Sequence, residues 1–280
     1  MVKMERKVVI ITGASSGIGC DAALELARRG HRVYAAARRV SLMEPLKAYG
    51  ISVLPLDVTD ELSMQSAVDT VLQAEGCIDV LVNNAGYGYF GAVETVPMEE
   101  ARRQLEVNVF GLSRLCQLVL PTMRRQGSGR IVNISSIAGR MVFPFGGWYH
   151  VSKYSVEALS DAMRMELKPF GIDVVLVEPG GIKTDWGIIA SQHLKESSTG
   201  TPYEADGARF AELMHRGYTS SLLSHPRAIT RVLLRAVDSR CPKARYRAGR
   251  ASSLLVLLHN LLPARCWDAL MRRAVRIKLK

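Results

Sequence analysis

Short runs of consecutive apolar residues alternate, over the first two thirds of the chain, with longer segments of helical periodicity. The runs are rich in Val and Ile and lie at residues 8–12, 32–36, 52–56, 79–82, 130–134 and 173–177. A run that is apolar at nearly every position, rather than at every second one, is typical of a parallel strand buried on both faces. The pattern therefore predicts six strands in one parallel sheet.

The segments between these runs carry apolar residues at helical spacing. They predict helices at residues 21–29, 42–48, 61–74, 98–125, 148–168 and, beyond the last strand, 226–237. Strands and helices that alternate in this order connect by right-handed crossovers. The predicted fold is a doubly wound, Rossmann-type α/β domain: a parallel sheet of six to seven strands with helices on both faces.

Residues 184–224 interrupt this alternation. The stretch mixes polar and apolar residues without a clear period and includes Gly187, Gly200 and Pro202. A connection of this length without secondary structure of its own is usually a binding loop or a disordered segment. We predict a long mobile loop here, which serves as a substrate lid.

The composition is that of a soluble globular protein, with 280 residues of which 48% are hydrophobic and 22% charged. These values exclude a disordered or low-complexity chain. The net charge of +11 is unevenly distributed, because residues 240–280 hold eleven Lys and Arg and a single acid, Asp268. We therefore predict a nearly neutral domain, 1–240, followed by a basic helical C-terminal extension, 241–280.

The five cysteines are scattered and form no C-x-x-C pair, so neither a disulfide framework nor a zinc site is predicted. We expect no bound metal, and a reducing, cytoplasmic environment. The apolar run at residues 8–11 is too short for the core of a signal peptide. The longest nearly uncharged run of the extension, 251–263, is well short of the ~20 residues that span a bilayer.

A glycine-rich sequence, Thr12-Gly13-Ala14-Ser15-Ser16-Gly17-Ile18-Gly19, follows the first predicted strand, and a helix begins near Gly17. Glycines at such a turn let the backbone approach a pyrophosphate, whose charge is met by amide N–H groups and by the positive end of the helix dipole. The spacing G-x-x-x-G-x-G differs from the commoner G-x-G-x-x-G. Taken alone, the motif also fits an ordinary turn between a strand and a helix.

Further motifs follow in order: Asp57-Val58, Asn83-Asn84-Ala85-Gly86, Asn108, Ser136, Tyr149-x-x-x-Lys153 and Pro179-Gly180. Together with the glycine-rich turn, this series resembles the short-chain dehydrogenase/reductase family, in its standard-length branch, over residues 7 to about 240. Within that family the chain is similar to hydroxysteroid and retinol dehydrogenases. The resemblance implies transfer of a hydride between a nicotinamide cofactor and a ketone or secondary alcohol.

Tyr149 and Lys153 lie four residues apart on a predicted helix and share a face. The pKa of a free phenol is about 10, too high for proton exchange at neutral pH, and a neighbouring ammonium lowers it. The resemblance makes Tyr149 the general acid or base and gives Lys153 a hydrogen bond to the nicotinamide ribose. It makes Ser136 the group that binds the substrate oxygen, with Ser135 as the alternative. Asn108 is expected to hold a relay water on its backbone carbonyl.

The resemblance also assigns the cofactor contacts. They are the glycine-rich turn (Gly13, Ser15, Ser16, Gly17, Ile18 and Gly19), Arg38, Asp57, Val58, Asn84, Ala85, Gly86, Lys153, Pro179, Gly180, Ile182 and Thr184. Asp57 and Val58 are expected beside the adenine, and the Asn-Asn-Ala-Gly segment along the adenosine half. The segment from Pro179 to Thr184 is expected beside the nicotinamide.

The end of the second strand indicates which dinucleotide binds. A carboxylate there holds the ribose 2′-OH of NAD, whereas an Arg accommodates the 2′-phosphate of NADP. No acid occurs between Glu25 and Glu44. Ala37 stands where NAD-binding members of the resembled family carry Asp, and Arg38 where NADP-binding members carry Arg. We therefore predict NADP(H) rather than NAD(H), with Arg38 preferred over Arg39 as the contact.

Apolar and aromatic residues close to these motifs predict a hydrophobic substrate pocket. They are Tyr87, Tyr89, Phe90, Phe143, Pro144, Phe145 and Trp148. Such a pocket suits a hydrophobic ketone or alcohol, either steroid- or retinoid-like or an aliphatic or aryl carbonyl. A non-catalytic NADP(H)-sensing protein with the same fold is the alternative, and the complete set of catalytic residue types favours the enzyme.

The basic extension interleaves leucines with arginines, which is the pattern of amphipathic helices. Two interpretations remain open: residues 251–280 bind the surface of an anionic membrane, or their leucines pack onto the domain or a partner subunit. Nucleic acid is not expected as a partner, because Tyr246 and Trp267 are the only aromatics of the extension. The resemblance further implies a homodimer or homotetramer, paired through the predicted helices 98–125 and 148–168.

Overall fold

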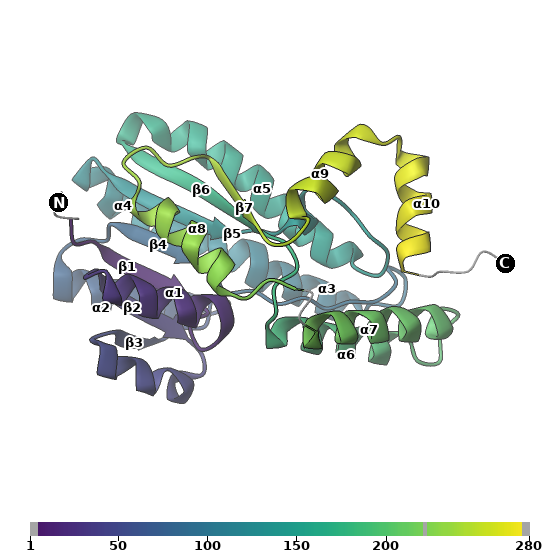
Figure 1. Cartoon of the computed structure of the whole chain (residues 1–280). Helices are drawn as coiled ribbons and strands as arrows, with labels where there is room; N and C mark the ends of the chain where they lie inside the picture. Colours follow the sequence, from purple (N-terminus) through teal and green to yellow (C-terminus); the bar gives the residue numbers. More distant parts are fainter. Residues whose placement is uncertain (1–4, 221–222, 276–280) are drawn as a thin grey trace.

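The computed structural model describes residues 5–220 and 223–275 (Figure 1). Seven parallel strands form one sheet in the order β3-β2-β1-β4-β5-β6-β7. They are β1 (Val8–Thr12), β2 (Arg32–Ala37), β3 (Ser52–Pro55), β4 (Val80–Asn83), β5 (Gly129–Ile134), β6 (Ile172–Pro179) and β7 (Arg245–Ala248). The predicted fold class is confirmed, and β7 extends the sheet beyond the six predicted strands.

Helices cover both faces of the sheet. The α-helices are α1 (Gly17–Arg28), α2 (Glu61–Glu75), α3 (Met98–Leu105), α4 (Leu112–Gln126), α5 (Gly147–Leu167), α6 (Asp185–Ser198), α7 (Glu204–Thr219), α8 (Arg227–Asp238), α9 (Ser252–Leu261) and α10 (Ala264–Ala274). Short 3₁₀ segments lie at η1 (Val40–Tyr49), η3 (Ile137–Gly139) and η4 (Lys168–Phe170). The segment after β2, predicted as a helix at 42–48, therefore has the tighter 3₁₀ winding.

Each central strand contributes to two cores, which explains its unbroken apolar run. Successive side chains of a strand point to opposite faces of the sheet. On β1, Ile10 lies in the core that includes Val119 of α4, and Ile11 lies in the core that includes Leu26 of α1. Both isoleucines are almost completely buried. A polar residue at either position would face an apolar layer, and the one polar residue of β1, Thr12, lies at its end.

A π-helical turn, η2 (Glu106–Gly111), interrupts the predicted helix 98–125 between α3 and α4. The turn passes close to the segment after β3, since a Cβ on Gly111 would lie 2.2 Å from the carbonyl oxygen of Val58. Only glycine permits this approach. The wider turn rotates the side chains that follow it and carries Asn108 into the interior, where it is 1% exposed.

Residues 184–224 are not the mobile loop that their composition predicted. The helices α6 and α7 form a packed pair over most of the stretch (green in Figure 1). The glycines are points of close contact: a Cβ on Gly207 would lie 2.1 Å from Ser198 Oγ, and one on Gly187 would lie 2.2 Å from the ring of Tyr218. The prediction was wrong because it took these glycines as breakers, whereas they let the two helices approach each other.

The sheet continues past residue 240, where the charge pattern placed the boundary of the domain. β7 pairs with β6, from Arg245 beside Leu176 to Ala248 beside Pro179. Arg245 and Arg247 belong by composition to the basic tail, yet both pair with buried carboxylates of the domain. The boundary at 240 is therefore too early, because two of the charges that suggested it serve the sheet.

The remainder of the extension folds as α9 and α10 (yellow in Figure 1). Val256 and Trp267 are buried with Ile137 and Met141 in a small core, and Trp267 Nε1 donates a hydrogen bond to the carbonyl oxygen of Val142 at 2.7 Å. Part of the amphipathic pattern thus packs onto the domain. Up to residue 275, where the described part of the extension ends, four leucines are exposed: Leu254, Leu257, Leu261 and Leu270.

The last residues of the predicted basic pattern, Arg276, Ile277, Lys278 and Lys280, lie outside the described residues. Over the ranges that the structure does describe, no helix has both the length and the apolar character needed to cross a bilayer.

Candidate functional site

A cavity of about 1190 Å³ opens at the carboxyl ends of the strands, where the strand order reverses between β1 and β4. Ligands of doubly wound sheets bind at this reversal. Every residue predicted to contact cofactor or substrate oxygen lines the cavity, with the exceptions of Gly19 and Asn108. The structure thus brings together residues that the sequence separates by more than 170 positions, from Gly13 to Thr184.

The glycine-rich turn is tied to the segment after β4. Thr12 Oγ1 accepts hydrogen bonds from the backbone N–H groups of Asn84 (3.0 Å) and Ala85 (2.9 Å). Asn84 Nδ2 in turn donates to the carbonyl oxygens of Thr12 (3.0 Å) and Gly13 (3.2 Å). The side chain of Asn84, predicted as a cofactor contact, therefore also holds the turn in shape.

Two glycines are required where these segments meet. Gly13 has φ +66°, and a Cβ on it would lie 2.8 Å from Ala85 Cα. A Cβ on Gly19 would lie 2.5 Å from Asn84 Nδ2. The helix α1 begins at Gly17, and its N-cap residue, Ser16, makes no side-chain hydrogen bond to the helix among the described residues. Ser15, Ser16 and Gly17 line the cavity at the start of α1, and the first N–H groups of a helix have no acceptor within it, which suits an anion.

The end of β2 places two arginines at the cavity. Arg38 NH1 lies 4.0 Å from Asp57 Oδ2, and the Arg38 side chain is 65% exposed. Arg39 NH2 donates a hydrogen bond to Ser15 Oγ of the glycine-rich turn at 3.2 Å. Burial raises the pKa of Asp57, but hydrogen bonds from Thr59 and the charge of Arg38 outweigh it, so the net pKa is lowered. Position 37, at the end of β2, is an alanine and carries no carboxylate, and two arginines follow it. This end of the cavity therefore favours a negatively charged ligand group.

The three predicted catalytic side chains meet on the other side of the cavity. Ser136 follows β5 and accepts a hydrogen bond from the backbone N–H of Ala138 at 3.1 Å, while its hydroxyl interacts with the phenol of Tyr149. Lys153 Nζ donates to the carbonyl oxygen of Ile134 at 2.9 Å and lies 5.9 Å from the centroid of the Tyr149 ring. Both Tyr149 and Lys153 are buried.

Burial controls the protonation of this pair. It raises the pKa of Tyr149 well above the usual range, and the hydrogen bond with Ser136 offsets only part of the effect. It lowers the pKa of Lys153 to about 8, against the opposing charge of Glu157. The expected depression of the phenol pKa by the ammonium is not the dominant effect in the protein alone. At neutral pH, Tyr149 is a protonated phenol that can donate a hydrogen bond.

Asn108 lies beside the site rather than in the cavity wall. Its Nδ2 donates to the carbonyl oxygen of Tyr87 at 2.9 Å and to Ser152 Oγ at 3.0 Å, and its Oδ1 accepts from the N–H of Tyr87 at 3.1 Å. The side chain thereby fixes the segment after β4. Of the two adjacent serines, Ser136 is the one whose hydroxyl acts on the phenol of Tyr149, whereas the hydroxyl of Ser135 is buried and has no hydrogen-bond partner among the described residues.

The remaining predicted contacts follow β3 and β6. Val58 and Ile182 are buried in the cavity wall. The N–H of Gly180 donates to the carbonyl oxygen of Ala248 at 2.8 Å, so β7 holds the turn after β6 in place. Thr184 is the N-cap residue of α6, and its methyl group would lie 3.6 Å from a Cβ on Gly17. The glycine-rich turn and the start of α6, which belong to different parts of the predicted cofactor site, therefore lie close together.

The substrate half of the cavity is aromatic, but its residues differ from the prediction. Tyr87, Tyr89, Phe90 and Phe143 line it as predicted, whereas Pro144, Phe145 and Trp148 do not. Phe145 is instead packed beside Tyr203 and Phe210, with ring centroids 6.2 and 6.1 Å away. Pro144, Phe145 and Trp148 were misplaced because proximity in sequence to Tyr149 does not determine the direction of a side chain in a turn.

The sequence prediction missed the wall supplied by α6 and α7. Its residues are Trp186, Ile189, His193, Glu196, Phe210, Met214 and Tyr218. The ring of Trp186 lies 5.0 Å from that of Tyr149, and Phe210 lies 6.2 Å from Phe143. A signal was present, because Phe210, Met214 and Tyr218 follow one another at intervals of four residues, the spacing of one helix face.

Polar and charged side chains also line the cavity. The rings of Tyr89 and His193 stack with centroids 4.9 Å apart, and the exposed Glu196 belongs to the same lining. Glu100 and Arg103 of α3 also line the cavity and form an ion pair at 3.7 Å. The cavity therefore combines an aromatic wall with charged side chains.

The described residues include no group of three or more His, Cys, Asp or Glu side chains arranged to hold a metal ion.

Comparisons with known proteins agree with this geometry. Residues 7–194 match the family model for short chain dehydrogenase. A 3-ketodihydrosphingosine reductase of Bacteroides thetaiotaomicron is 34% identical and aligned over 98% of each chain. An NADPH-dependent 3-dehydrocapnine reductase of Ornithobacterium rhinotracheale is 33% identical over 96% of this chain and 98% of its own. A solved short-chain dehydrogenase from Streptomyces avermitilis superposes with a TM-score of 0.80 at 30% identity, covering 98% of this chain and 100% of the other.

The close approach at Gly19 makes a testable prediction. In Gly19→Ala, the new methyl group would meet Asn84 Nδ2 and the Gly13 carbonyl oxygen, so the glycine-rich turn must shift. We expect the affinity for NADPH, measured by fluorescence titration, to fall by about tenfold or more, because the turn loses the shape that admits a pyrophosphate. Gly217→Ala is the matched control, since nothing lies within 4 Å of a Cβ there. Equal affinities in the two variants would contradict the role of the contact.

Proposed function

Because the chain belongs to the short-chain dehydrogenase family, we propose that it is an NADP(H)-dependent oxidoreductase that transfers a hydride between the nicotinamide and a hydrophobic ketone or secondary alcohol. One observation carries this proposal: Ser136, Tyr149 and Lys153 meet in a cavity whose opposite wall is the glycine-rich turn. A cavity of this size has room for a dinucleotide and a substrate side by side.

The proposed chemistry follows from the protonation of the site. The buried phenol of Tyr149 donates its proton to the carbonyl oxygen during reduction and recovers it during oxidation. The hydroxyl of Ser136 binds the same oxygen and orients it. When bound, the nicotinamide supplies or accepts the hydride. Lys153 holds the ribose and, as a cation, favours the phenolate that remains after proton transfer.

Asn108 is proposed to complete the site through its backbone carbonyl, which would hold a water in a relay to Lys153. Its place in a π-helical turn supports this role, because such turns are frequent at functional sites. Its side chain also fixes the backbone of Tyr87, in the segment that is expected along the adenosine half of the dinucleotide.

NADP(H) is proposed as the cofactor because the end of β2 offers Arg38 and Arg39 and no carboxylate. The name of the Ornithobacterium relative, an NADPH-dependent reductase, supports the same choice. Both relatives described above are named as reductases of keto or dehydro compounds, which supports reduction of a ketone as the direction. The aromatic wall of α6 and α7 supports a hydrophobic substrate, and it is proposed to act as the lid that closes over it.

We propose that copies of the chain associate through α4 and α5. The outer face of α5 carries exposed apolar side chains, with Met165 at 69% and Val151 at 46% exposure, and Phe110 just before α4 is 57% exposed. Apolar side chains grouped on one helix face suit a subunit interface.

Replacing the proposed acid tests the enzymatic function. Tyr149→Phe removes the proton donor but keeps the ring packing, so we expect carbonyl reduction with NADPH to fall by about 10²- to 10⁴-fold. Binding of NADPH should stay within about twofold, which separates loss of chemistry from loss of the cofactor. Tyr154→Phe, an exposed tyrosine of the same helix, serves as control. Unchanged turnover in Tyr149→Phe across a panel of ketones would favour the non-catalytic, NADP(H)-sensing alternative.

The two arginines at the end of β2 give a prediction for the cofactor. The wild type should prefer NADPH over NADH by about 10- to 100-fold in kcat/KM, the value of a charge-assisted hydrogen bond to phosphate. Arg38→Gln should remove most of this preference without slowing the reaction with NADH. If Arg39→Gln has the larger effect, Arg39 rather than Arg38 contacts the 2′-phosphate. A preference for NADH in the wild type would refute the assignment of NADP(H) as the cofactor.

We further propose that the exposed leucines of α9 and α10 dock on an anionic membrane surface. Arg265, Arg272 and Arg273 of α10 are exposed and make no ion pair within the described residues, so this part of the surface is apolar and cationic together. Phospholipids with acidic headgroups match both properties. A lipid-like ketone could then enter the cavity directly from the bilayer.

Sedimentation with vesicles tests the membrane proposal. The wild type should bind phosphatidylserine-containing vesicles and not pure phosphatidylcholine. Arg272→Gln should weaken binding about fivefold at low salt, since each basic residue contributes about 1 kcal/mol. The Leu257→Glu and Leu261→Glu variants should abolish binding, whereas Leu62→Glu, at an exposed leucine of α2, should not. If vesicles are not bound and Leu257→Glu lowers the mass seen by light scattering, the leucines form a subunit contact instead.

A further inference from the structure

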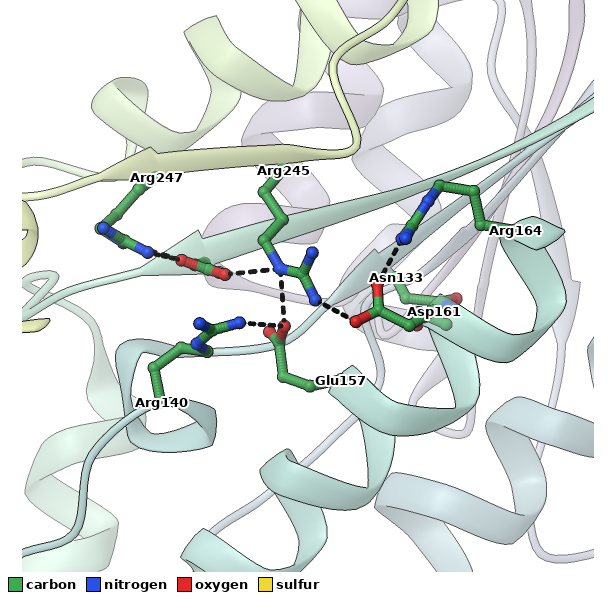
Figure 2. Close-up of polar contacts among 9 residues, drawn as sticks. Asn133, Arg140, Glu157, Asp161, Arg164, Arg245 and Arg247 are labelled. Atoms are coloured by element: carbon green, nitrogen blue, oxygen red, sulfur yellow. Dashed lines mark hydrogen bonds and ion pairs between the residues drawn. The ribbon is translucent and has the colours of Figure 1, made fainter. Parts of the chain in front are cut away.

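A cluster of carboxylates and arginines joins α5, β6 and β7 (Figure 2). The carboxylates are Glu157 and Asp161 of α5 and Glu178 of β6, and the arginines are Arg140, Arg164, Arg245 and Arg247. Glu157 is 5% exposed and Glu178 is fully buried. We name this set the carboxylate–arginine cluster. The other members are partly exposed, so the cost of burial falls mainly on these two carboxylates, and the arginines compensate part of it.

Arg245 is the centre of the cluster and comes from β7, the last strand of the sheet. Its Nε lies 3.0 Å from Glu157 Oε2 and 3.2 Å from Glu178 Oε1, and its NH2 lies 2.6 Å from Asp161 Oδ2. Arg247 pairs with the other oxygen of Glu178, and Arg140 NH1 approaches Glu157 Oε2 at 3.9 Å. One side chain near the C-terminus thus joins α5 to the end of β6.

Each of the two buried acids lies close in sequence to a residue of the proposed site. Glu157 follows Lys153 by one turn of α5, and Glu178 directly precedes Pro179. The space around Glu157 and Lys153 is tight, because a Cβ on Gly139 would lie 2.8 Å from the carbonyl oxygen of Lys153 and 3.0 Å from Glu157 Cγ. Gly139 therefore packs against the turn of α5 that carries both residues, which lie four positions apart on one side of the helix.

The charges around Lys153 are few. Its own helix offers Tyr149 and Glu157, and β5 offers the carbonyl oxygen of Ile134 as a hydrogen-bond acceptor. Burial alone would favour the neutral amine, and the negative charge of Glu157 opposes this by raising the pKa of Lys153. Removal of that charge would therefore shift the lysine toward its neutral form.

Arginines from two elements approach the carboxylate of Glu157. Arg245 approaches it from β7 at 3.0 Å and Arg140 from the segment after η3 at 3.9 Å. Burial and the charge of Glu178 raise the pKa of Glu157, and Arg245 opposes them, but the net pKa stays above its usual value. Glu178 is itself paired with Arg245 and Arg247. The arginines therefore stabilise the anionic form of Glu157 without cancelling the cost of its burial.

We propose that Glu157 is a positioning residue for catalysis, whose carboxylate, held by Arg245, keeps Lys153 in its cationic form inside the buried site. The inference rests on the proposed function, in which Lys153 acts as a cation toward the phenol and the ribose. It assigns to β7 a part in the reaction, although no side chain of β7 lines the cavity.

The test measures the protonation of Lys153 directly and then its consequence. In protein labelled with ¹³Cε-lysine and free of cofactor, the Lys153 signal is identified by its loss in Lys153→Arg and titrated by NMR. In Glu157→Gln the midpoint should fall by about one pH unit, because the anion that stabilises the ammonium is gone. In kinetics with NADPH and a ketone, the alkaline limb of the kcat profile should move to lower pH by the same amount.

Two variants control for structural damage. Asp161→Asn removes another partner of Arg245, one that lies two turns from Lys153. It should leave unchanged both the NMR midpoint of Lys153 and the pH at which kcat declines on the alkaline side. Glu157→Asp keeps the charge and should restore most of the Lys153 midpoint. Near-ultraviolet circular dichroism checks the fold of each variant, and Glu157→Asp carries the test if Glu157→Gln does not fold: its midpoint should stay within about 0.3 units of the wild type.

An unchanged Lys153 midpoint in Glu157→Gln would overturn the inference, even in an active enzyme. Equal shifts in Glu157→Gln and Asp161→Asn would also overturn it, because they would indicate a general loosening of the helix. Failure of the proposed function has a different signature: the NMR midpoint would shift while wild type and Tyr149→Phe alike reduced no ketone.

Discussion

Two side chains, Thr12 and Asn84, tie the end of β1 to the segment after β4, and the cavity depends on this tie. The Thr12 hydroxyl accepts two backbone N–H groups, and the Asn84 amide donates to two carbonyl oxygens. Backbone groups at a strand end have no partner in the sheet, and burying them unpaired is costly. The cross-connection satisfies them and fixes the glycine-rich turn at a spacing that only glycine allows. Hydrogen bonds within the protein thus set the shape of the cavity at the glycine-rich turn.

The strands and most helices could be predicted from sequence because one physical rule governs them. A strand between two helical layers must be apolar on both sides, and the printed sequence shows this directly at residues such as Ile10 and Ile11. The order of polar motifs at strand ends likewise predicted which residues would meet, since parallel strands deliver all their carboxyl ends to one edge. Gly13, Asp57, Asn84 and Pro179 line one cavity for this reason.

The helices α6 and α7 could not be predicted from composition, because their glycines serve packing and not turns. Gly187 receives the ring of Tyr218, and Gly207 receives Ser198, a relation between two helices that no local pattern contains. The same limit applies to the π-helical turn at Asn108, which arises where Gly111 passes Val58. Charge was misleading in a similar way, since Arg245 and Arg247 count as part of a basic tail although internal acids neutralise them.

The position of β7 near the end of the chain has a consequence for the order of synthesis. A ribosome releases Lys153, Glu157 and Glu178 well before Arg245, so a growing chain holds two acids that are destined for the interior without their partner. Until Arg245 arrives, these acids favour hydration, and α5 and the end of β6 cannot close firmly on each other. In chains that end before β7, both acids lack Arg245, and the cost of burying them unpaired weakens the packing of α5 on the sheet.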